Sequence, residues 1–258
     1  FLELGNIKTM LKSAFGVDVS VSYVYRIVRD MKFSWRKLGV SPYNWNSPAN
    51  IKLWGKYAEC FQDLKELGNC TFFFVDESSF GPHLRNERGY VTKGSKDAVA
   101  ERRSVRAQAY SMVALLGPKG LDMYQMIKGS HNSGTFLNFL RIADQYIRRN
   151  YTRGANIIVL DNVALHKVDE IWDIFPHIDV AGWVPGQRLG NFQLKLLFLP
   201  AYSPFLNPIE EVFGWLKRRV KQSQPDGAQD LFNVLELGQS ELSEDLMRAF
   251  FNHMVSYI

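Results

Sequence analysis

The sequence has few cysteines and no long hydrophobic segment. Its 258 residues include two cysteines, too few for a disulfide framework, and no spacing of cysteine and histidine predicts a zinc site. No apolar run approaches the roughly 18–20 residues that a membrane-spanning helix needs, and no secretory signal pattern is present. We therefore expect reduced thiols at Cys60 and Cys70, no zinc and no helical membrane span.

The charge of the chain is modest in total and uneven along the sequence. The net charge is +5, with 46% hydrophobic and 22% charged residues, as in ordinary globular proteins. Residues 1–42 hold seven Lys or Arg against three acidic residues and so carry +4 of that total. Such a concentration of positive charge is typical of nucleic-acid binding, although a solvated helix face has the same composition. The sequence begins with Phe1 rather than Met, and we expect N-terminal sequence to be missing.

The basic segment has the pattern of two helices joined by a turn. Ile7–Phe15 reads as the first helix, and Gly16–Ser20 as a turn that places Ser20 at the N-cap of the second. A core stripe is expected on the second helix at Val24, Ile27, Val28 and Met31. The opposite face presents Ser22, Arg26 and Arg29. This pattern favours a helix-turn-helix whose second helix enters the major groove, and the alternative is a structural helical hairpin.

A linker and a further helix follow the basic segment. Phe33–Pro48 contains the breakers Ser41-Pro42 and Ser47-Pro48 and reads as a linker. Basic and aromatic residues interleave in it, so we expect it to lie along DNA through Arg36 and Lys37. Ala49–Leu67 has helical periodicity, with a core stripe at Ile51, Trp54, Ala58, Phe61 and Leu64.

Two short apolar runs each end in an aspartate. Thr71–Asp76 and Asn156–Asp161 read as strands buried on both faces of a sheet. Ligands collect where the carboxyl ends of such strands leave the sheet. A lone aspartate at a strand end is more often a turn or cap residue. Together with a third acidic residue in a comparable position, the two aspartates make a binding site the stronger hypothesis.

A third acidic residue follows another short strand. Lys195–Leu199 is of strand length and is stopped by Pro200, and a helix then starts with Asn207 as N-cap and Glu210 at N3. Its apolar face is expected at Ile209, Phe213, Leu216 and Val220. Glu210 lies off this face, and its alternative role is to complete a capping box with Asn207. Three carboxylates at two strand ends and one helix start could hold divalent cations for phosphoryl chemistry.

The remaining elements complete an alternating pattern. Ala107–Leu116 and Leu121–Lys128 read as a hairpin, and a helix with core positions Phe136, Leu140, Ala143 and Ile147 precedes the Asp161 strand. Phe80–Lys96 reads as a charged hairpin that could clamp a phosphate backbone through residues including Arg88 and Lys93, or could simply be solvated. Leu242–Tyr257 reads as a closing helix.

Four blocks of this sequence resemble the successive motifs of Tc/mariner-type DDE transposases, including their bacterial insertion-sequence relatives. They are Asp76-Glu-Ser-Ser-Phe80, Arg88-Gly-Tyr-Val-Thr-Lys-Gly94, Leu160-Asp-Asn-Val-Ala-Leu-His166 and Leu199-Pro-Ala-Tyr-Ser-Pro-Phe-Leu-Asn-Pro-Ile-Glu210. The resemblance implies an α/β fold in which a small all-α helix-turn-helix segment precedes a ribonuclease-H-like catalytic domain. It also implies that Asp76, Asp161 and Glu210 form a catalytic triad holding two Mg²⁺ or Mn²⁺ ions.

The resemblance further implies cleavage of DNA at transposon ends and strand transfer into target DNA by a homodimer. Asn162 and His166 would orient the metal site or touch DNA. The expected domains are 1–42 (helix-turn-helix), 43–70 (linker and helix) and 71–258 (catalytic). As the location of the protein in the cell, the nucleus of a eukaryote is favoured over the cytoplasm or nucleoid of a bacterium. The alternatives are a host-adapted DNA-binding descendant and a ribonuclease-H-like nuclease.

Three further predictions concern the segment from Asp161 to Lys221. Asp161 and Glu210 are further apart than is usual in the family, and we expect the surplus to be a surface loop at Phe175–Phe192. Glu210 rather than Glu211 is expected to be the third ligand. The basic run Lys217–Lys221 is either a solvated helix face or a nuclear address or DNA track.

Overall fold

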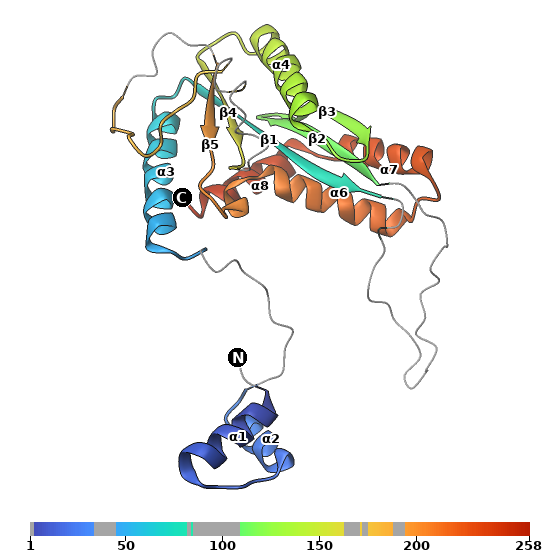
Figure 1. The fold of residues 1–258 in the computed structure, drawn as a ribbon. Helices are drawn as coiled ribbons and strands as arrows, with labels where there is room; N and C mark the ends of the chain where they lie inside the picture. Colours follow the sequence, from blue (N-terminus) through green and yellow to red (C-terminus); the bar gives the residue numbers. More distant parts are fainter. Residues whose placement is uncertain are drawn as a thin grey trace. The chain divides into compact units, whose positions relative to one another are not determined.

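The computed structural model describes residues 3–33, 45–81, 84, 109–162, 171, 175–187 and 194–258. The chain divides into two compact units, Phe1–Pro42 and Tyr43–Ile258 (Figure 1). None of the helices in these ranges is both long enough and apolar enough to cross a membrane.

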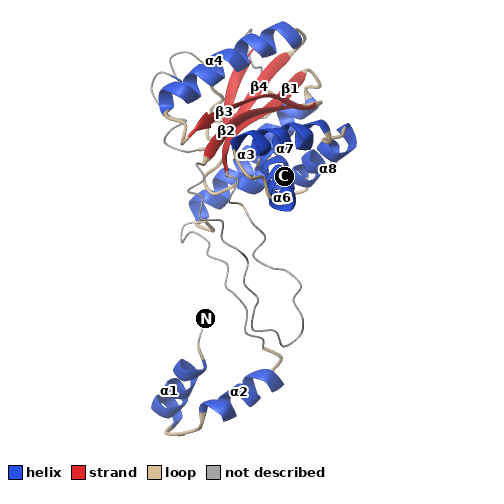
Figure 2. Ribbon diagram, turned by 90° about the vertical axis from the view of Figure 1, so that its right-hand side faces the viewer, coloured by secondary structure: helices blue, strands red, loops and turns tan. Residues whose placement is uncertain are grey.

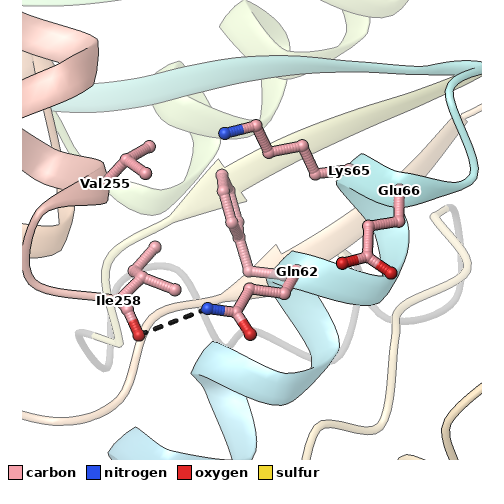
Figure 3. A pocket seen from close by; sticks show the side chains of 6 residues that line it. Gln62, Lys65, Glu66, Val255 and Ile258 are labelled. Carbon is pink, nitrogen blue, oxygen red and sulfur yellow. Dashed lines mark hydrogen bonds between the residues drawn. The ribbon is translucent and has the colours of Figure 1, made fainter.

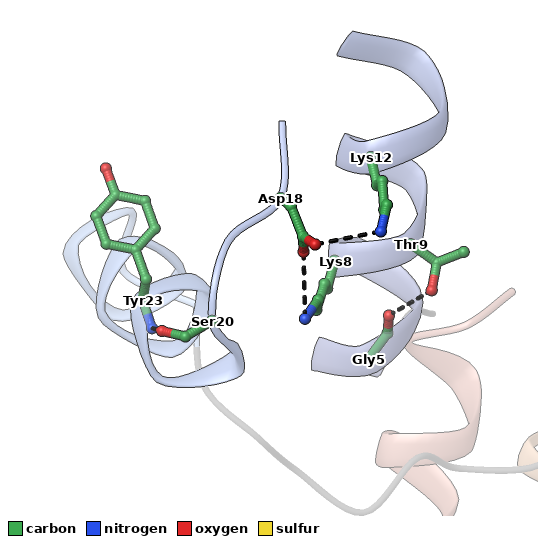
Figure 4. Close-up of polar contacts among 7 residues, drawn as sticks. All are labelled: Gly5, Lys8, Thr9, Lys12, Asp18, Ser20 and Tyr23. Carbon is green, nitrogen blue, oxygen red and sulfur yellow. Dashed lines mark hydrogen bonds and ion pairs between the residues drawn. The ribbon is translucent and has the colours of Figure 1, made fainter. Parts of the chain in front are cut away.

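The first unit is a pair of helices, α1 (Leu4–Phe15) and α2 (Val21–Asp30), as predicted. Gly16 ends α1 in the left-handed conformation (φ 68°), which glycine adopts without steric cost. Ser20 caps α2 by accepting a hydrogen bond from the backbone N–H of Tyr23 at 3.1 Å (Figure 4). Asp18, in the turn between the helices, accepts ion pairs from Lys8 at 3.3 Å and from Lys12 at 3.2 Å.

The predicted core stripe of α2 is only partly buried. Val24 is 2% exposed, whereas Ile27 and Met31 are 41% and 62% exposed. Two short helices present too little surface to each other to cover a full stripe, because burial falls steeply with domain size. The expectation that all four stripe residues pack inside this unit is therefore wrong.

The second unit is built on a mixed five-stranded sheet with the order β3-β2-β1-β4-β5. β1 pairs antiparallel with β2 and parallel with β4, and β5 extends the parallel half. The two-residue turn Pro118-Lys119 joins β2 to β3, as the hairpin prediction required. The strands are β1 (Cys70–Phe80), β2 (Tyr110–Gly117), β3 (Gly120–Lys128), β4 (Ala155–Leu160) and β5 (Leu194–Phe198).

Helices cover both faces of this sheet (Figure 2). One face packs against α4 (Ser133–Asn150), whose predicted core residues Phe136, Leu140, Ala143 and Ile147 are all fully buried. The other face packs against the remaining helices, which share a second core that includes Phe74, Val159 and Leu197 of the strands. These helices are α3 (Pro48–Glu66), α6 (Ile209–Ser223), α7 (Ala228–Ser240) and α8 (Glu244–Val255).

Two of these helices differ from the sequence prediction. In α3, Ile51 is 53% exposed, and the residues that pack in the core are Tyr57, Cys60, Phe61 and Leu64. Ser47 caps this helix by accepting from the Asn50 N–H, with Pro48 in its first turn, so the Ser-Pro pair starts a helix instead of ending a linker. α7 was not predicted from the sequence, whereas the predicted closing helix is present as α8.

The segment expected to be a surface loop is partly core. Phe175, Ile178 and Trp183 are 3%, 6% and 4% exposed. The backbone N–H of Ile178 donates to the carbonyl of Leu196 at 2.8 Å, which ties the segment to β5. The Trp183 ring N–H donates to Asp63 of α3 at 3.0 Å. The prediction of a surface loop is therefore wrong for the buried part of 175–187, because the packing of this segment depends on its aromatic residues and not on its Gly and Pro.

Candidate carboxylate active site

The sheet brings the two predicted aspartates side by side. The parallel pairing of β1 with β4 ends at Val75 and Leu160, so Asp76 and Asp161 are the next residue on each strand. The prediction that this strand ends at Asp76 is wrong. β1 continues to Phe80 because it remains paired with β2, in which Ala114 lies opposite Asp76. Asp76 therefore stands on a rigid strand at the point where its neighbouring strand stops.

Asp76 is buried and accepts hydrogen bonds from two donors. Its side chain is 9% exposed. Oδ1 accepts from the backbone N–H of Glu77 at 2.7 Å, and Oδ2 accepts from the side-chain amide of Asn207 at 2.9 Å. Burial raises the pKa of Asp76 to about 7, and the negative charges of Glu210 and Asp161 add to this increase. Asp161 lies beside Asp76 at the end of the β1–β4 pairing, and Glu210 comes three residues after Asn207, which contacts Asp76.

Glu210 reaches this site from the start of α6. The helix begins at Ile209 with Pro208 at its N-cap, and no side chain caps it. The prediction that Asn207 is the N-cap is wrong, because its amide is turned to Asp76 instead. Partial burial raises the pKa of Glu210, the charge of Lys217 lowers it, and the charge of Asp161 raises it again. The apolar face of α6 is buried as predicted, at Ile209, Phe213, Leu216 and Val220.

The neighbouring acid, Glu211, has a different partner. Its Oε1 lies 2.5 Å from Nδ1 of His253 on α8. The other ring nitrogen of His253 lies 3.2 Å from the hydroxyl of Tyr257. This engagement with α8 favours Glu210 over Glu211 as the acid that acts with Asp76 and Asp161.

The connection that leads into α6 is held from several sides. Tyr202 adopts φ 59°, a left-handed conformation uncommon for a residue with a side chain. The ring N–H of Trp54 on α3 donates to the carbonyl of Ala201 at 3.4 Å. Phe205, in the single 3-10 turn η2 (Pro204–Leu206), packs edge-on against Trp54 with 5.5 Å between ring centroids. These contacts fix the position from which Asn207 reaches Asp76.

The donor set suits a hard divalent cation, although the acids are not drawn together. Within the ranges that the structure describes, no three His, Cys, Asp or Glu side chains are grouped closely enough to hold one ion. Asp76 and Asp161 are instead turned toward backbone N–H groups, those of Glu77 and Asn162. Carboxylate oxygens are the ligands that Mg²⁺ prefers, and a cation would offset the negative charges of Glu210 and Asp161 that help to raise the pKa of Asp76.

Two buried amide oxygens beside the acids also remain available. Oδ1 of Asn162 and Oδ1 of Asn207 are buried and accept no hydrogen bond within the described part of the chain. Both residues flank the site, Asn162 directly after Asp161 and Asn207 against Asp76. Buried unpaired oxygens are costly unless a ligand or water satisfies them. The oxygen atoms of these residues therefore suit a divalent cation. For the three acids to bind the same ion, their side chains would have to rotate toward one another.

The residues predicted to touch DNA are described only in part. Ser22, Arg26 and Arg29 lie on exposed faces of α2 in the first unit. The guanidinium of Arg26 lies 5.6 Å from the ring centroid of Tyr23, and that of Arg29 lies 5.8 Å from that of Tyr25. Asn162 adjoins the carboxylates. The other predicted contacts lie outside the described residues: Arg36, Lys37, Arg88, Lys93 and His166.

The basic run on α6 is not a continuous track. Val220 is buried in the core, and Arg219 forms an ion pair with Glu241 while lying 4.6 Å from the ring centroid of Trp215. Lys217 instead projects over Phe80 of β1, with its Nζ 5.8 Å from the ring centroid. The contacts of Asn207 with Asp76 and of Lys217 with Phe80 were not predicted from the sequence. Asn207 lies three residues before Glu210, as a helix cap would, and Lys217 lies two helical turns after it.

A separate hollow lies away from these acids. It has a volume of about 460 Å³ and lies between α3 and the C-terminal residues. Gln62 donates across it to the carbonyl of Ile258 at 3.4 Å (Figure 3). The residues around it include none of the predicted site residues, so it does not bear on the carboxylate chemistry.

Comparison with known proteins gives a family for the chain. A family described as "DDE superfamily endonuclease" matches residues 71–231, which is more than half of the chain and includes all three acids. No curated protein sequence matches. Among solved structures, the Mos1 mariner paired-end complex with Mn is similar with a TM-score of 0.72 and 14% identity, over 100% of this chain and 72% of that chain.

Two further Mos1 structures show the same similarity. The Mos1 strand transfer complex has a TM-score of 0.64 and 14% identity, over 99% of this chain and 75% of that chain. The catalytic domain of Mos1 mariner transposase has a TM-score of 0.59 and 12% identity, over 86% of this chain and 94% of that chain. At this level of identity the similarity concerns the fold, and it confirms the predicted ribonuclease-H-like domain preceded by a helical segment. The sequence match over residues 71–231 goes further, and by it the chain belongs to the DDE superfamily of endonucleases.

Proposed function

We propose that this chain is a DDE transposase, which cleaves DNA at the ends of a mobile element and joins those ends to target DNA. The observation that carries the proposal is the placement of Asp76 beside Asp161 at the carboxyl end of the β1–β4 pair, with the segment that leads to Glu210 held to Asp76 by Asn207. The family match covers this site. The Mos1 structures with a similar fold include a paired-end complex and a strand transfer complex.

The cofactor that we propose is Mg²⁺ or Mn²⁺, as two ions held by Asp76, Asp161 and Glu210. Mos1 structures were solved with each of these metals. When bound, such a pair of ions supplies activation of a water or 3′-hydroxyl nucleophile and stabilisation of the leaving oxygen. The hard oxygen donors of the site and its lack of a nucleophilic thiol both favour this chemistry over a covalent enzyme intermediate.

The side chains around the acids set their orientation. Asn207 donates to one oxygen of Asp76 and the Glu77 N–H donates to the other, so these two groups limit the orientations open to the carboxylate before any ligand arrives. Pre-oriented ligands lose less freedom on binding. Glu210, in the first turn of α6, is the most exposed of the three acids.

The partners that we propose are double-stranded DNA at two element ends and at the target, bound by a homodimer. The exposed arginines of α2 and the +4 charge of residues 1–42 support DNA binding by the first unit. The paired-end Mos1 complexes support an assembly that holds two ends. Because the substrate is chromosomal DNA, the compartment would be the nucleus in a eukaryotic host and the nucleoid in a bacterial one, and of these we favour the nucleus.

Single substitutions of the three acids test the function. Asp76→Asn, Asp161→Asn and Glu210→Gln should each abolish nicking of supercoiled plasmid in Mn²⁺ and strand transfer of a pre-cut element end. Glu211→Gln removes the same charge one residue away, and it should retain most of the activity. Near wild-type cleavage by any of the three variants would refute the assignment of that acid.

The same assay separates the rival functions. A host-adapted DNA-binding descendant would bind duplex DNA and show no metal-dependent cleavage in the unmodified protein. A ribonuclease-H-like nuclease would cleave an RNA–DNA hybrid faster than the DNA duplex and would join no ends. Either result would replace the transposase proposal.

A further inference from the structure

The turn that carries Glu210 has little support of its own. No side chain caps the N-terminus of α6. The backbone N–H groups of Glu210 and Glu211 donate to the carbonyls three residues before them, at 3.1 Å and 3.2 Å. The ends of a helix open more easily than its centre unless contacts from outside hold them. The position of Glu210 therefore depends on what the rest of the fold attaches to this turn.

Helix α8 contacts the turn through His253. Oε1 of Glu211, the residue after Glu210, lies 2.5 Å from Nδ1 of His253. An ionised carboxylate only accepts hydrogen bonds, so the hydrogen of this contact is on Nδ1. The other ring nitrogen, Nε2, lies 3.2 Å from the hydroxyl of Tyr257, one turn further along α8. The imidazole is thus held from two sides, and one of them is the first turn of α6.

The same helix also holds the chain before Glu210. The ring of Tyr257 lies 5.3 Å from that of Phe205 in η2, and 5.2 Å from that of His253, measured between centroids. Phe205 comes five residues before Glu210, and Glu211 comes one residue after it. α8 therefore contacts the chain on both sides of the third acid.

α8 is itself fixed to the fold. Met247 and Met254 are 6% and 1% exposed, and they lie in the same core as Phe213 and Leu216 of α6. Figure 2 shows α6 and α8 on the same side of the sheet. His253 directly precedes Met254, so a buried residue anchors the backbone that presents the imidazole to Glu211.

The pair of Glu211 and His253 is too exposed to contribute much to stability. The two side chains are 35% and 56% exposed, and ion pairs that are open to water contribute little to the free energy of folding. A group that orients a metal ligand, in contrast, typically changes metal affinity or activity by about 10–100-fold when it is removed. The effect of this pair should therefore appear at the carboxylate site more than in the stability of the protein.

We propose that His253 is a positioning residue for Glu210. Through Glu211 it holds the first turn of α6, from which the side chain of Glu210 rotates to bind a cation together with the two aspartates. His253 itself touches neither the ion nor the DNA. This inference rests on the proposed function, because it identifies how the third ligand of that site is held.

His253→Phe is the central variant for the test. Phenylalanine keeps a ring against Tyr257 and removes both nitrogens. In the full chain with EDTA, hydrogen–deuterium exchange of the backbone amides of residues 209–213 should become faster, while the unfolding temperature should change little. In an equilibrium titration with Mn²⁺, the affinity should fall by about 10–100-fold. The first readout needs no metal, and neither readout depends on catalysis.

Conservative variants should restore what His253→Phe removes. His253→Asn places an amide donor where Nδ1 stands, so it should recover most of the Mn²⁺ affinity. Glu211→Gln keeps an acceptor for the imidazole and should bind Mn²⁺ nearly as the unmodified protein does. Glu211→Ala should lose as much affinity as His253→Phe, and the two changes together should lose no more than either alone, because they break one interaction.

The matched control is a second exposed ion pair on α6. Arg219, near the far end of the helix, pairs with Glu241 after α7, and their side chains are 36% and 37% exposed. Glu241→Ala breaks this pair without touching the first turn. It should leave the Mn²⁺ affinity and the amide exchange of residues 209–213 unchanged.

Three results would overturn the inference. A lower unfolding temperature in His253→Phe with unchanged Mn²⁺ affinity would make the pair purely structural. An equal loss of affinity in Glu241→Ala would mean that any weakening of α6 has the same effect. Tighter Mn²⁺ binding in His253→Phe that Glu211→Ala cancels would show that a released Glu211 becomes a ligand. In each case the unmodified protein still nicks plasmid DNA and Glu210→Gln does not. Failure of the unmodified protein to cleave would instead contradict the proposed function.

Discussion

Asn207 donates a hydrogen bond from its side-chain amide to Oδ2 of Asp76 at 2.9 Å, and both residues are more than nine-tenths buried. The contact joins the residue before the α6 cap to the middle of β1. It explains why Asn207 does not cap the helix that follows it. The first acid and the segment that carries the third are therefore held together by one amide.

Removing this amide should impair the site more than the fold. Asn207→Ala leaves Oδ2 of Asp76 without its donor, and loss of such an orienting partner typically costs about 10–100-fold in metal affinity or activity. We expect a loss of that size in plasmid nicking, and a decrease of about 1–3 kcal/mol in the free energy of unfolding. Asn252→Ala, at an exposed position of α8, is the control. Nicking at the wild-type rate by Asn207→Ala would contradict an orienting role.

The pKa of Asp76 predicts how stability depends on pH without metal. The acid has a pKa of about 7 in the folded protein, against 3.8 for the unperturbed group, so the folded state binds its proton more tightly. Between about pH 4 and pH 7 the free energy of unfolding should therefore fall as the pH rises, by up to about 4 kcal/mol. Chemical denaturation at several pH values, with EDTA present, measures this. Asp76→Asn should remove most of the dependence.

Divalent cations should reverse that dependence. Mg²⁺ or Mn²⁺ binds the ionised acids, so it should raise the unfolding temperature more at pH 8 than at pH 5. Ca²⁺ at equal concentration is a useful comparison, because it prefers more ligands and longer bonds. Stabilisation of equal size at both pH values, or in Asp76→Asn as much as in the unmodified protein, would mean that the ions bind elsewhere.

Trp183 should prove essential for stability although its surroundings look like a loop. The side chain is 4% exposed, and its ring N–H donates to Asp63, which also accepts from the backbone N–H of Gly186 at 3.1 Å. Trp183→Ala should lower the free energy of unfolding by about 3–5 kcal/mol. Trp183→Phe keeps most of the packing and loses the hydrogen bond, so it should cost less. Val184→Ala, at a 62% exposed position, should be nearly neutral.

Most of the fold could be predicted because its signals are local. The helical period of α4 and the continuous apolar run of β4 each identify an element without knowledge of its neighbours. The acids could be placed together because parallel strands end at one edge of the sheet. The course of β1 beyond Asp76 could not be predicted, since its continuation to Phe80 depends on pairing with β2.

The side-chain roles that were missed depend on contacts distant in sequence. The spacing of Asn207 from Glu210 indicates a cap, and only the neighbouring strand shows that its amide goes to Asp76. Likewise, Gly182 and Gly186 mark 175–187 as a loop, and the aspartate of α3 that binds Trp183 lies 120 residues earlier. Local propensity identifies the conformation of such a segment and leaves its packing undetermined.

The arginines of α2 should act in binding and not in catalysis. Arg26 and Arg29 lie beside the rings of Tyr23 and Tyr25, which hold their guanidinium groups against the helix. Arg26→Ala and Arg29→Ala should each reduce the salt slope of duplex binding by about 0.9 if the contact is to a phosphate. A contact to a base should instead cost about 1–3 kcal/mol on the cognate sequence alone. Mn²⁺ affinity should not change in either variant, and unchanged DNA binding in both would make residues 1–42 a structural hairpin.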